Sequence, residues 1–346
     1  MEKRMKQVTL GSTGITVPQN GFGALPIQRI SEDDAAALVR GAYEGGMTFF
    51  DTARAYTDSE VKMGKAIADV RDKIFIASKT KPVSVEQFWK DLETTLTNLK
   101  TDHLDIYQLH CVDQCYAPGD GTGFYEALLE AKKQGKIRHI GITTHKIAVA
   151  EEICESGLYE TLQYPLSYLS TEREIKLTEK CREHNMGYIA MKGLAGGLIT
   201  NSRAAMAFMT QFDNVIPIWG IQRKKELDEW LAFFDETPEL DDEIRSFIEE
   251  EKKNMSGDFC RGCGYCMPCP QGISINDCAR MSLMIRRAPS DAWLNEHWQT
   301  EMQKINNCVS CGSCMKKCPY ELNTPQLLKD NLADYENVLA GRTSVK

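Results

Sequence analysis

The chain has 346 residues, 42% hydrophobic and 26% charged, an ordinary composition for a globular protein with one large and one small domain. Its 41 basic and 49 acidic residues give a net charge of −8 without a clustered basic excess, which argues against nucleic-acid binding. No run of about 18 apolar residues occurs, so we expect no membrane anchor, and the 13 cysteines favour a reducing, cytoplasmic location.

Between about residues 19 and 235, short apolar segments alternate with amphipathic ones, as in a parallel sheet with helical crossovers. A small hairpin at 8–18 precedes them. The expected strands are 21–25, 48–52, 74–78, 104–110, 139–143, 161–165, 187–191 and 215–219. The helices after them begin near Glu32, Ser59, Ser84, Phe124, Lys146, Thr171, Ser202 and Arg223. Eight such units predict an α/β fold, a (β/α)₈ TIM barrel, whose usual size of about 250 residues matches this stretch.

Beyond residue 235 the alternation stops. The segment 239–254 predicts one more helix, with an acidic start and a basic end that suit the helix dipole. Cysteine-rich sequence follows from about residue 257. We therefore expect two domains: 1–256, the barrel with its trailing helix, and 257–346, a small α-helical iron–sulfur domain.

Eight cysteines of the second domain lie in two runs, CRGCGYCMPCP at 260–270 and CVSCGSCMKKCP at 308–319. The spacing of the second run resembles that of bacterial ferredoxins, which bind [4Fe-4S] clusters. The first run has two residues, not three, between its third and fourth cysteines. In two-cluster ferredoxins the fourth cysteine of each run ligates the other cluster. The resemblance thus implies two clusters, one bound by Cys260, Cys263, Cys266 and Cys318 and the other by Cys308, Cys311, Cys314 and Cys269.

Zinc is the alternative metal, because paired C-x-x-C motifs also form structural zinc sites. Those sites use two pairs of thiolates, which fits poorly with triplets followed by Cys-Pro. Cys278, between the runs, is either a spare thiol or a substitute ligand. The scattered cysteines are expected to be small buried hydrophobes; they are Cys111, Cys115, Cys154 and Cys181.

Polar residues follow three consecutive expected strands, at the end of a barrel where catalytic groups stand. Asp51 ends the second strand and Tyr56 lies in the loop after it, while Lys79 and His110 end the third and fourth strands. Singly, each has an ordinary explanation as a helix cap or a solvated side chain. As a set in this order they resemble the aldo-keto reductase family, over about residues 8–235.

This resemblance implies an oxidoreductase that reduces a carbonyl group. Tyr56 would protonate the carbonyl oxygen as hydride reaches the carbon, and His110 would orient that oxygen. A free phenol has a pKa of about 10 and is a poor acid at neutral pH. We therefore expect Lys79, held in place by Asp51, to lower the pKa of Tyr56.

The resemblance extends to a nicotinamide site. Thr143, Thr144 and Gln163 lie where the family holds the carboxamide. The segments 193–197 and 217–223 lie where the family holds the cofactor phosphates. Together with the end of the seventh strand, they contain the other expected cofactor contacts: Met191, Gly193, Leu194, Gly196, Gly220 and Arg223. Met191 stands where many members stack a tyrosine on the nicotinamide. Acidic residues, Glu226 and Glu229, lie near the usual 2′-phosphate arginine position, so NAD and NADP are not distinguished.

The two domains differ in how they carry electrons, since a nicotinamide gives a hydride and a cluster gives single electrons. A flavin in the barrel, a substrate radical or purely structural clusters would each resolve the difference. The leading hypothesis is a reductase of a small carbonyl or conjugated carbonyl compound, with electrons relayed through two clusters from a partner such as ferredoxin or flavodoxin. The alternatives are an FMN-dependent reductase fed by ferredoxin, and a non-catalytic redox-sensing or electron-transfer module.

Overall fold

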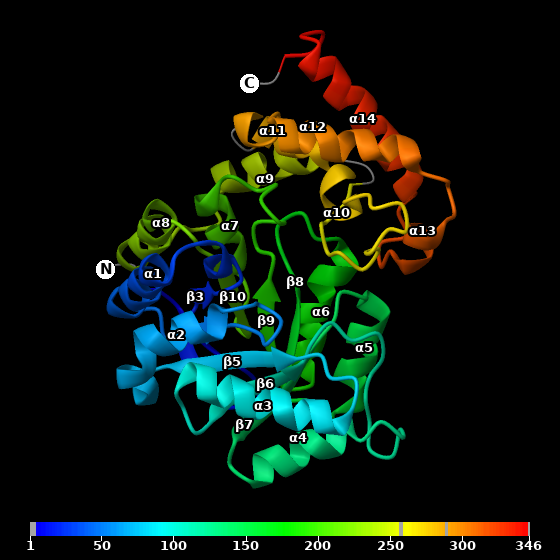
Figure 1. Cartoon of the computed structure of the whole chain (residues 1–346). Helices are drawn as coiled ribbons and strands as arrows, with labels where there is room; N and C mark the ends of the chain where they lie inside the picture. Colours follow the sequence, from blue (N-terminus) through cyan, green and yellow to red (C-terminus); the bar gives the residue numbers. More distant parts are fainter. Residues whose placement is uncertain (1–4, 256–258, 288–289, 345–346) are drawn as a thin grey trace. The chain divides into compact units, whose positions relative to one another are not determined.

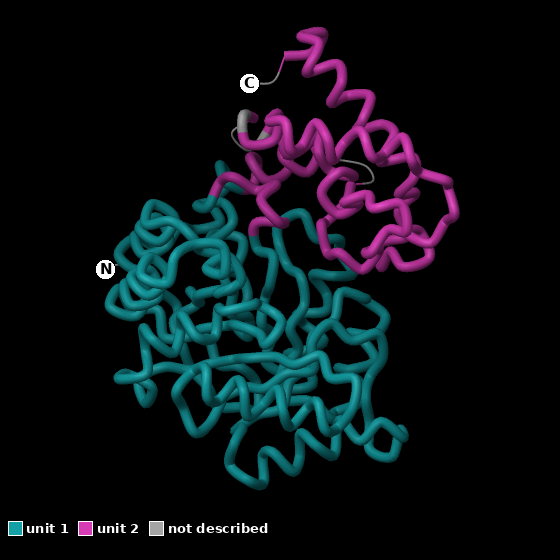
Figure 2. The backbone as a smooth tube through the Cα atoms, in the orientation of Figure 1, with its two compact units in different colours: residues 1–193, 202–244 teal, residues 194–201, 245–346 magenta. Residues whose placement is uncertain are grey.

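The computed structural model describes residues 5–255, 259–287 and 290–344. Its contacts divide the chain into two compact units, each considered by itself (Figure 2). The first unit comprises residues 1–193 and 202–244, and the second comprises 194–201 and 245–346. The boundary expected near residue 256 lies outside the described residues and stays a prediction.

The first unit is built around a closed barrel of parallel strands (Figure 1). In the described residues, eight strands close it in the order β10-β3-β4-β5-β6-β7-β8-β9. Their bounds are β3 Gly21–Gly23, β4 Phe49–Asp51, β5 Phe75–Thr80, β6 Leu104–Leu109, β7 Ile137–Thr143, β8 Thr161–Pro165, β9 Gly187–Met191 and β10 Val215–Gly220. Two expected strands match residue for residue and the others differ by at most two residues at either end, so the predicted (β/α)₈ barrel is confirmed.

A helix follows each barrel strand, and each begins at the expected residue or directly after it. The helices are α1 Glu32–Glu44, α2 Ser59–Ile67, α3 Val85–Leu99, α4 Phe124–Lys133, α5 Ile147–Ser156, α6 Glu172–Glu183, α7 Ser202–Met209 and α8 Lys224–Asp235. Side-chain caps set several of these starts, because an N-cap oxygen binds an amide of the first turn that has no partner within the helix. The Ser31 and Ser84 hydroxyls, for example, accept from the amides of Asp34 and Gln87, each at 3.1 Å.

The expected hairpin is also present. Strands β1 Gln7–Thr9 and β2 Thr16–Pro18 pair antiparallel. Their apolar side chains, such as Val8 and Val17, are buried in one cluster with barrel residues that include Phe49, Ile106 and Ile216. The hairpin therefore closes one end of the barrel with apolar side chains, which leaves the other end for polar ones.

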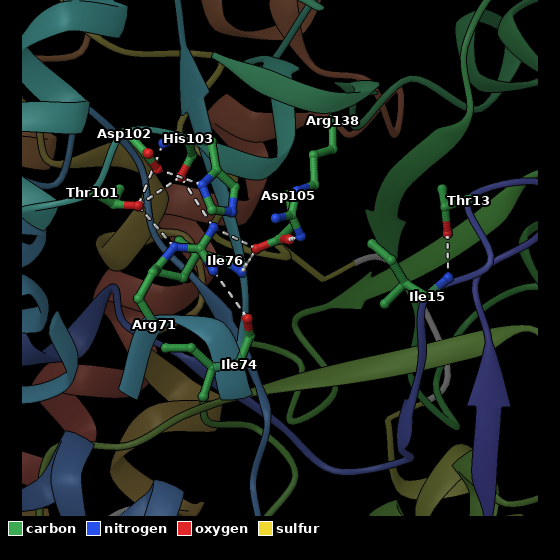
Figure 3. Close-up of polar contacts among 10 residues, drawn as sticks. All are labelled: Thr13, Ile15, Arg71, Ile74, Ile76, Thr101, Asp102, His103, Asp105 and Arg138. Atoms are coloured by element: carbon green, nitrogen blue, oxygen red, sulfur yellow. Dashed lines mark hydrogen bonds and ion pairs between the residues drawn. The ribbon is translucent and has the colours of Figure 1, made fainter. Parts of the chain in front are cut away.

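A buried carboxylate ties three barrel strands together near their amino-terminal ends (Figure 3). Asp105, the second residue of β6, accepts from Arg71 at 2.7 Å and from the amide of Ile76 in β5 at 2.9 Å. Its other oxygen accepts from Arg138 of β7 at 3.0 Å. Because these partners satisfy the carboxylate on both sides, the charge is tolerated inside the barrel wall.

The second unit is helical in its C-terminal part. Helix α9 Asp242–Asn254 begins in the first unit and continues into the second from residue 245. The helices that follow are α10 Ile275–Cys278, α11 Met281–Arg287, α12 Glu296–Gln303, α13 Ser313–Lys317 and α14 Thr324–Leu339. Helix α14 contacts α10 to α13, and a buried apolar cluster that includes Ile285, Met302 and Leu328 lies among them. Among the described residues, none of the helices is both long and apolar enough to cross a membrane.

Replacing Asp105 with alanine should destabilise the barrel by about 3 kcal/mol, because Arg71, with a side chain only 10% exposed, loses its buried counterion. Asp102→Ala is the matched control: its side chain is 95% exposed, so we expect a much smaller change than in Asp105→Ala. Urea unfolding followed by far-ultraviolet circular dichroism measures both. Equal midpoints for the two variants would contradict a structural role for Asp105.

Candidate active site and iron–sulfur sites

The four expected catalytic residues meet at the carboxyl-terminal end of three neighbouring strands. Asp51 is the last residue of β4, Lys79 is the fifth residue of β5, and His110 directly follows β6. The strands pair in parallel, with Asp51 opposite Ala77 of β5. Tyr56 lies in the loop between β4 and α2. The strand ends therefore bring together side chains that are up to 59 positions apart in the sequence.

A buried ion pair is the centre of this group. The Lys79 ammonium donates to the Asp51 carboxylate at 2.7 Å and to the Thr52 carbonyl oxygen at 2.7 Å. The two charged side chains are 1% and 2% exposed. Burial raises the pKa of Asp51, and the ammonium of Lys79 opposes that rise. The pair fixes the ammonium at the strand ends, where it also faces the ring of Tyr56.

Tyr56 lies between the lysine and the histidine. The Lys79 nitrogen is 5.2 Å from the centre of the Tyr56 ring, and the His110 ring is 5.8 Å away, edge to face. Burial, with smaller contributions from Asp51 and Cys111, raises the pKa of Tyr56 well above its ordinary value.

The expectation that Lys79 lowers the pKa of Tyr56 is therefore wrong. The ammonium is bound to the Asp51 carboxylate, so the pair presents little net charge to the phenol. Burial then decides the shift, since it disfavours the phenolate. The phenol is protonated at every ordinary pH, which is the form that a proton donor needs before it reacts.

His110 is held neutral. Burial, followed by the charges of Lys79 and Lys81, lowers its pKa to about 3. A neutral imidazole carries one N–H donor and one acceptor, so it can donate to a carbonyl oxygen without adding a charge to the site. The arrangement therefore provides one hydrogen-bond donor and one proton donor on adjacent elements.

A buried glutamate that sequence reasoning missed holds the loop of Tyr56. Glu60 of α2 is 1% exposed and pairs with Arg54, whose amide donates to the Lys79 carbonyl at 2.9 Å. The Glu60 carboxylate also accepts hydrogen bonds from the hydroxyls of Ser78 at 2.9 Å and Thr95 at 2.7 Å. The sequence did carry a signal: Glu60 occupies a position on the buried face of α2 where an apolar residue is usual.

The residues expected to bind the carboxamide are buried and already hydrogen-bonded within the protein. The Thr143 hydroxyl accepts from the Cys111 amide at 2.7 Å, and the Thr144 hydroxyl donates to the Val112 carbonyl at 2.8 Å. The Gln163 side-chain oxygen accepts from Gln108 at 2.9 Å. These groups hold the start of the loop after β6 in place, and their cofactor role stays a prediction.

Met191, expected beside the nicotinamide, belongs to the first unit. The residues expected to bind phosphates fall in both units: Gly193, Gly220 and Arg223 belong to the first, whereas Leu194 and Gly196 belong to the second. A Cβ atom on Gly193 would lie 2.5 Å from the ring of Trp219, so only glycine fits there. The Arg223 guanidinium pairs with Glu226 at 2.7 Å, and Lys224 pairs with Asp228. These two cations at the start of α8 thus pair with carboxylates, whereas the third, Lys225, is exposed.

The cysteine runs line two cavities in the second unit. Counted with the solvent space open to them, the first spans about 350 Å³ and the second about 420 Å³. The cysteines around the first are Cys260, Cys263, Cys266 and Cys318. Those around the second include Cys308, Cys311, Cys314 and Cys269, with Cys266 between the two cavities. Each cavity is therefore bordered by the four cysteines that the ferredoxin resemblance assigns to one cluster, the short-spaced Cys269 included.

The arrangement suits a cluster better than a zinc ion. Zinc draws its thiolates to about 2.3 Å from one point. Among the described residues, no three cysteine, histidine or carboxylate side chains converge to hold a single ion. Cys278 borders neither cavity; it is fully buried in the apolar cluster, with its sulfur 3.8 Å from the Glu301 carbonyl oxygen.

The barrel and the polar groups at its strand ends are those of a (β/α)₈ enzyme, and two family models divide the sequence accordingly. The model of the aldo/keto reductase family matches residues 19–252, and the chain belongs to this family of oxidoreductases. A 4Fe-4S dicluster domain matches residues 259–323. The chain is thus an aldo-keto reductase barrel joined to an iron–sulfur domain.

Curated relatives and a solved structure resemble the barrel. An L-galactose dehydrogenase from Arabidopsis thaliana is 32% identical over 55% of this chain and 66% of its own length. A methylglyoxal reductase from Salmonella typhi is 36% identical over 40% of this chain and 52% of its own length. The chain thus spans between half and two thirds of these relatives. An aldo-keto reductase from Klebsiella pneumoniae in complex with NADPH shares the fold, with a TM-score of 0.59 and 22% identity, over 71% of this chain and 94% of that one.

We expect about eight iron atoms per chain in protein prepared without oxygen, from two cubane clusters. Cys311→Ser should lower this to about four, because an exposed ligand is lost without disturbing the core. Cys278→Ser is the matched control and should leave about eight, since its sulfur borders neither cavity. Iron and acid-labile sulfide analysis measures both. Zinc in place of iron, or equal losses in the two variants, would contradict the assignment.

Proposed function

We propose that this chain reduces the carbonyl group of a small molecule, including conjugated carbonyl compounds, and that two [4Fe-4S] clusters relay electrons to the barrel. The observation that carries the first part is the Lys79–Asp51 pair at 2.7 Å beside the Tyr56 ring. A non-catalytic redox sensor has no need of a proton donor held beside a buried ion pair. We therefore favour an enzyme over a sensing or electron-transfer module.

The residues of the barrel supply the proton and the orientation for carbonyl reduction. A bound NAD(P)H would supply hydride to the carbonyl carbon. Tyr56 donates its phenolic proton to the carbonyl oxygen, and the neutral His110 donates a hydrogen bond to the same oxygen. The Lys79 ammonium, 5.2 Å from the centre of the Tyr56 ring, donates to the Thr52 carbonyl oxygen and so holds the start of the loop that carries Tyr56. Asp51 keeps that ammonium in place.

The start of α8 carries three cations that bear on the choice of nicotinamide. Arg223 and Lys224 pair with Glu226 and Asp228, whereas Lys225 is exposed and has no ion pair among the described residues. The cofactor that we propose is NAD(P)H, and the related Klebsiella pneumoniae enzyme is in complex with NADPH. FMN, bound at the same barrel end, is the alternative, because a flavin exchanges both hydride and single electrons.

The second cavity is the one through which we propose that electrons enter. One of its cysteines, Cys311, is exposed, whereas Cys260 of the first cavity is buried. Lys316 and Lys317 of α13 are also exposed and follow Cys314 of the same cavity in the sequence. A small acidic electron carrier such as a ferredoxin or flavodoxin would be attracted to such cations. Purely structural needs are met more simply by zinc, which is redox-inert.

Tyr56→Phe should lower turnover of a carbonyl substrate on the order of 10²-fold or more, because only the transferred proton is lost. Nucleotide affinity should stay nearly unchanged. Tyr116→Phe is the matched control, since it removes a phenol from a partly buried tyrosine whose ring packs on Phe124, outside the group at the strand ends. Steady-state kinetics and nucleotide titration measure the two quantities. Turnover near normal in Tyr56→Phe would show that the proton comes from another group.

A reduced one-electron donor, such as ferredoxin or dithionite with a viologen, should drive substrate reduction without any nicotinamide. The clusters deliver electrons singly, so this reaction needs an FMN in the barrel or a substrate radical that takes up two electrons in turn. With two protons, these two electrons replace the hydride and the proton of the nicotinamide reaction. Rapid mixing under argon should show cluster bleaching that reverses when substrate is added. Cys311→Ser should lose this donor-driven reaction. Bleaching that persists in the presence of substrate would exclude the relay and leave the clusters a structural role.

A further inference from the structure

Arg280 lies between α10 and α11 of the second unit, and its side chain is 10% exposed. Its guanidinium donates to the carbonyl oxygen of Gly196 at 3.0 Å. The carboxylate that forms an ion pair with the guanidinium, that of Asp277, is 3.8 Å away. The Nε atom of Arg280 is buried without a hydrogen-bond partner among the described residues. A largely buried cation with only a distant carboxylate is costly, which points to a role beyond packing.

Two glycines in the left-handed region of φ make room for this guanidinium. Gly196 has φ +69° and Gly262 has φ +63°. A Cβ atom on Gly196 would lie 2.6 Å from an Arg280 nitrogen, and one on Gly262 would lie 2.9 Å from the central guanidinium carbon. Both glycines belong to the same unit as Arg280. The guanidinium therefore lies against two backbone segments that a side chain at either glycine would push away.

One of these segments leads to the first cluster site. The Gly262 amide donates to the sulfur of Cys260 at 3.4 Å. Cys260 borders the first cavity, as does its neighbour Arg261. Arg280 lies against Gly262, and Gly262 donates to Cys260, a cysteine that we assign to the first cluster. The positive charge of Arg280 is therefore near that cluster. A [4Fe-4S] cluster with four thiolates gains one negative charge on reduction, and a fixed cation nearby stabilises the reduced form.

The other segment lies in the sequence between β9 and α7. Gly196 lies in the stretch 193–197, which sequence reasoning assigned to phosphate contacts. Leu198 and Ile199, which follow it, are buried, and the whole of 194–201 is grouped with the C-terminal residues (Figure 2). The hydrogen bond from Arg280 to Gly196 therefore fixes a segment whose two ends continue into the barrel strands and helices.

We propose that Arg280 is a positioning residue that holds the first cluster at a raised reduction potential and fixes the Gly196 segment in the conformation that binds the cofactor phosphates. The proposal rests on the cluster and cofactor assignments of the proposed function. Its two parts act through one guanidinium, because the same planar group lies against Gly262 and donates to the Gly196 carbonyl oxygen.

The test uses the full chain with its clusters, prepared without oxygen. Arg280→Gln removes the charge and keeps a polar side chain. At a fixed potential, we expect the ratio of reduced to oxidised first cluster to fall on the order of tenfold, which equals 59 mV for a one-electron couple. Redox titration followed by electron paramagnetic resonance measures this ratio. The second cluster is the internal reference and should move less.

Two further variants separate charge from packing. Arg280→Lys keeps the charge and should retain most of the potential, but it loses the planar group and should weaken nucleotide binding several-fold. Arg286→Gln is the matched control: it removes a cation of α11 that pairs with Asp334, 2.8 Å away, and should change neither quantity. Iron content, measured for each variant, shows whether the clusters are intact.

An unchanged first-cluster potential in Arg280→Gln, with iron content intact, overturns the electrostatic part. If Arg280→Gln loses iron, Gly196→Ala decides, because its Cβ displaces the guanidinium without altering any charge. An unchanged potential and unchanged nucleotide affinity in that variant overturn the proposal. Failure of the wild-type protein to bind nucleotide would instead contradict the proposed function, and the potential measurement would still test Arg280.

Discussion

The buried pair of Asp51 and Lys79 is the interaction on which the candidate active site depends. Taking two charges out of water costs several kcal/mol per ion, so such a pair is weak evidence for stability and stronger evidence for a function. The barrel meets this cost by placing the two residues on neighbouring parallel strands, where their side chains meet at 2.7 Å. The third contact of the ammonium, with the Thr52 carbonyl, ties it to the loop of Tyr56. The pair is therefore important because it fixes the position of the Lys79 ammonium, not because it stabilises the fold.

The buried carboxylates at the two ends of the barrel differ in how they are paired. Asp105 accepts from two arginines and a backbone amide, so each of its oxygens has a partner within the protein. Asp51 instead has a single lysine as its counterion, and that lysine faces a tyrosine. In barrels of this kind the amino-terminal face serves stability and the carboxyl-terminal face serves catalysis. The two aspartates divide in that way, although the amino acid is the same.

Much of the fold and the outline of the site could be predicted from the sequence, because both depend on local patterns. Apolar runs of strand length gave the barrel strands, and polar residues at their ends gave Asp51, Lys79 and His110. The pKa of Tyr56 could not be predicted, since it depends on how completely Asp51 compensates Lys79 and on burial. Glu60 and Arg280 were missed for a related reason. Their partners are distant in sequence: Thr95 lies 35 residues from Glu60, and Gly196 lies 84 residues from Arg280.

Because of the segment 194–201, the unit that contains the iron–sulfur sites is joined to the barrel unit by more than one covalent connection. A domain appended at the end of a barrel needs only one covalent connection, at the chain boundary. This chain instead passes into the second unit after residue 193, returns at residue 202 and leaves again after residue 244. A change at the first cluster that moved Arg280 would act on Gly196 and, through the backbone, on Met191 and Ser202 at the two flanking elements. If Arg280 acts as we propose, the oxidation state of the first cluster and the binding of the cofactor depend on the same segment of backbone.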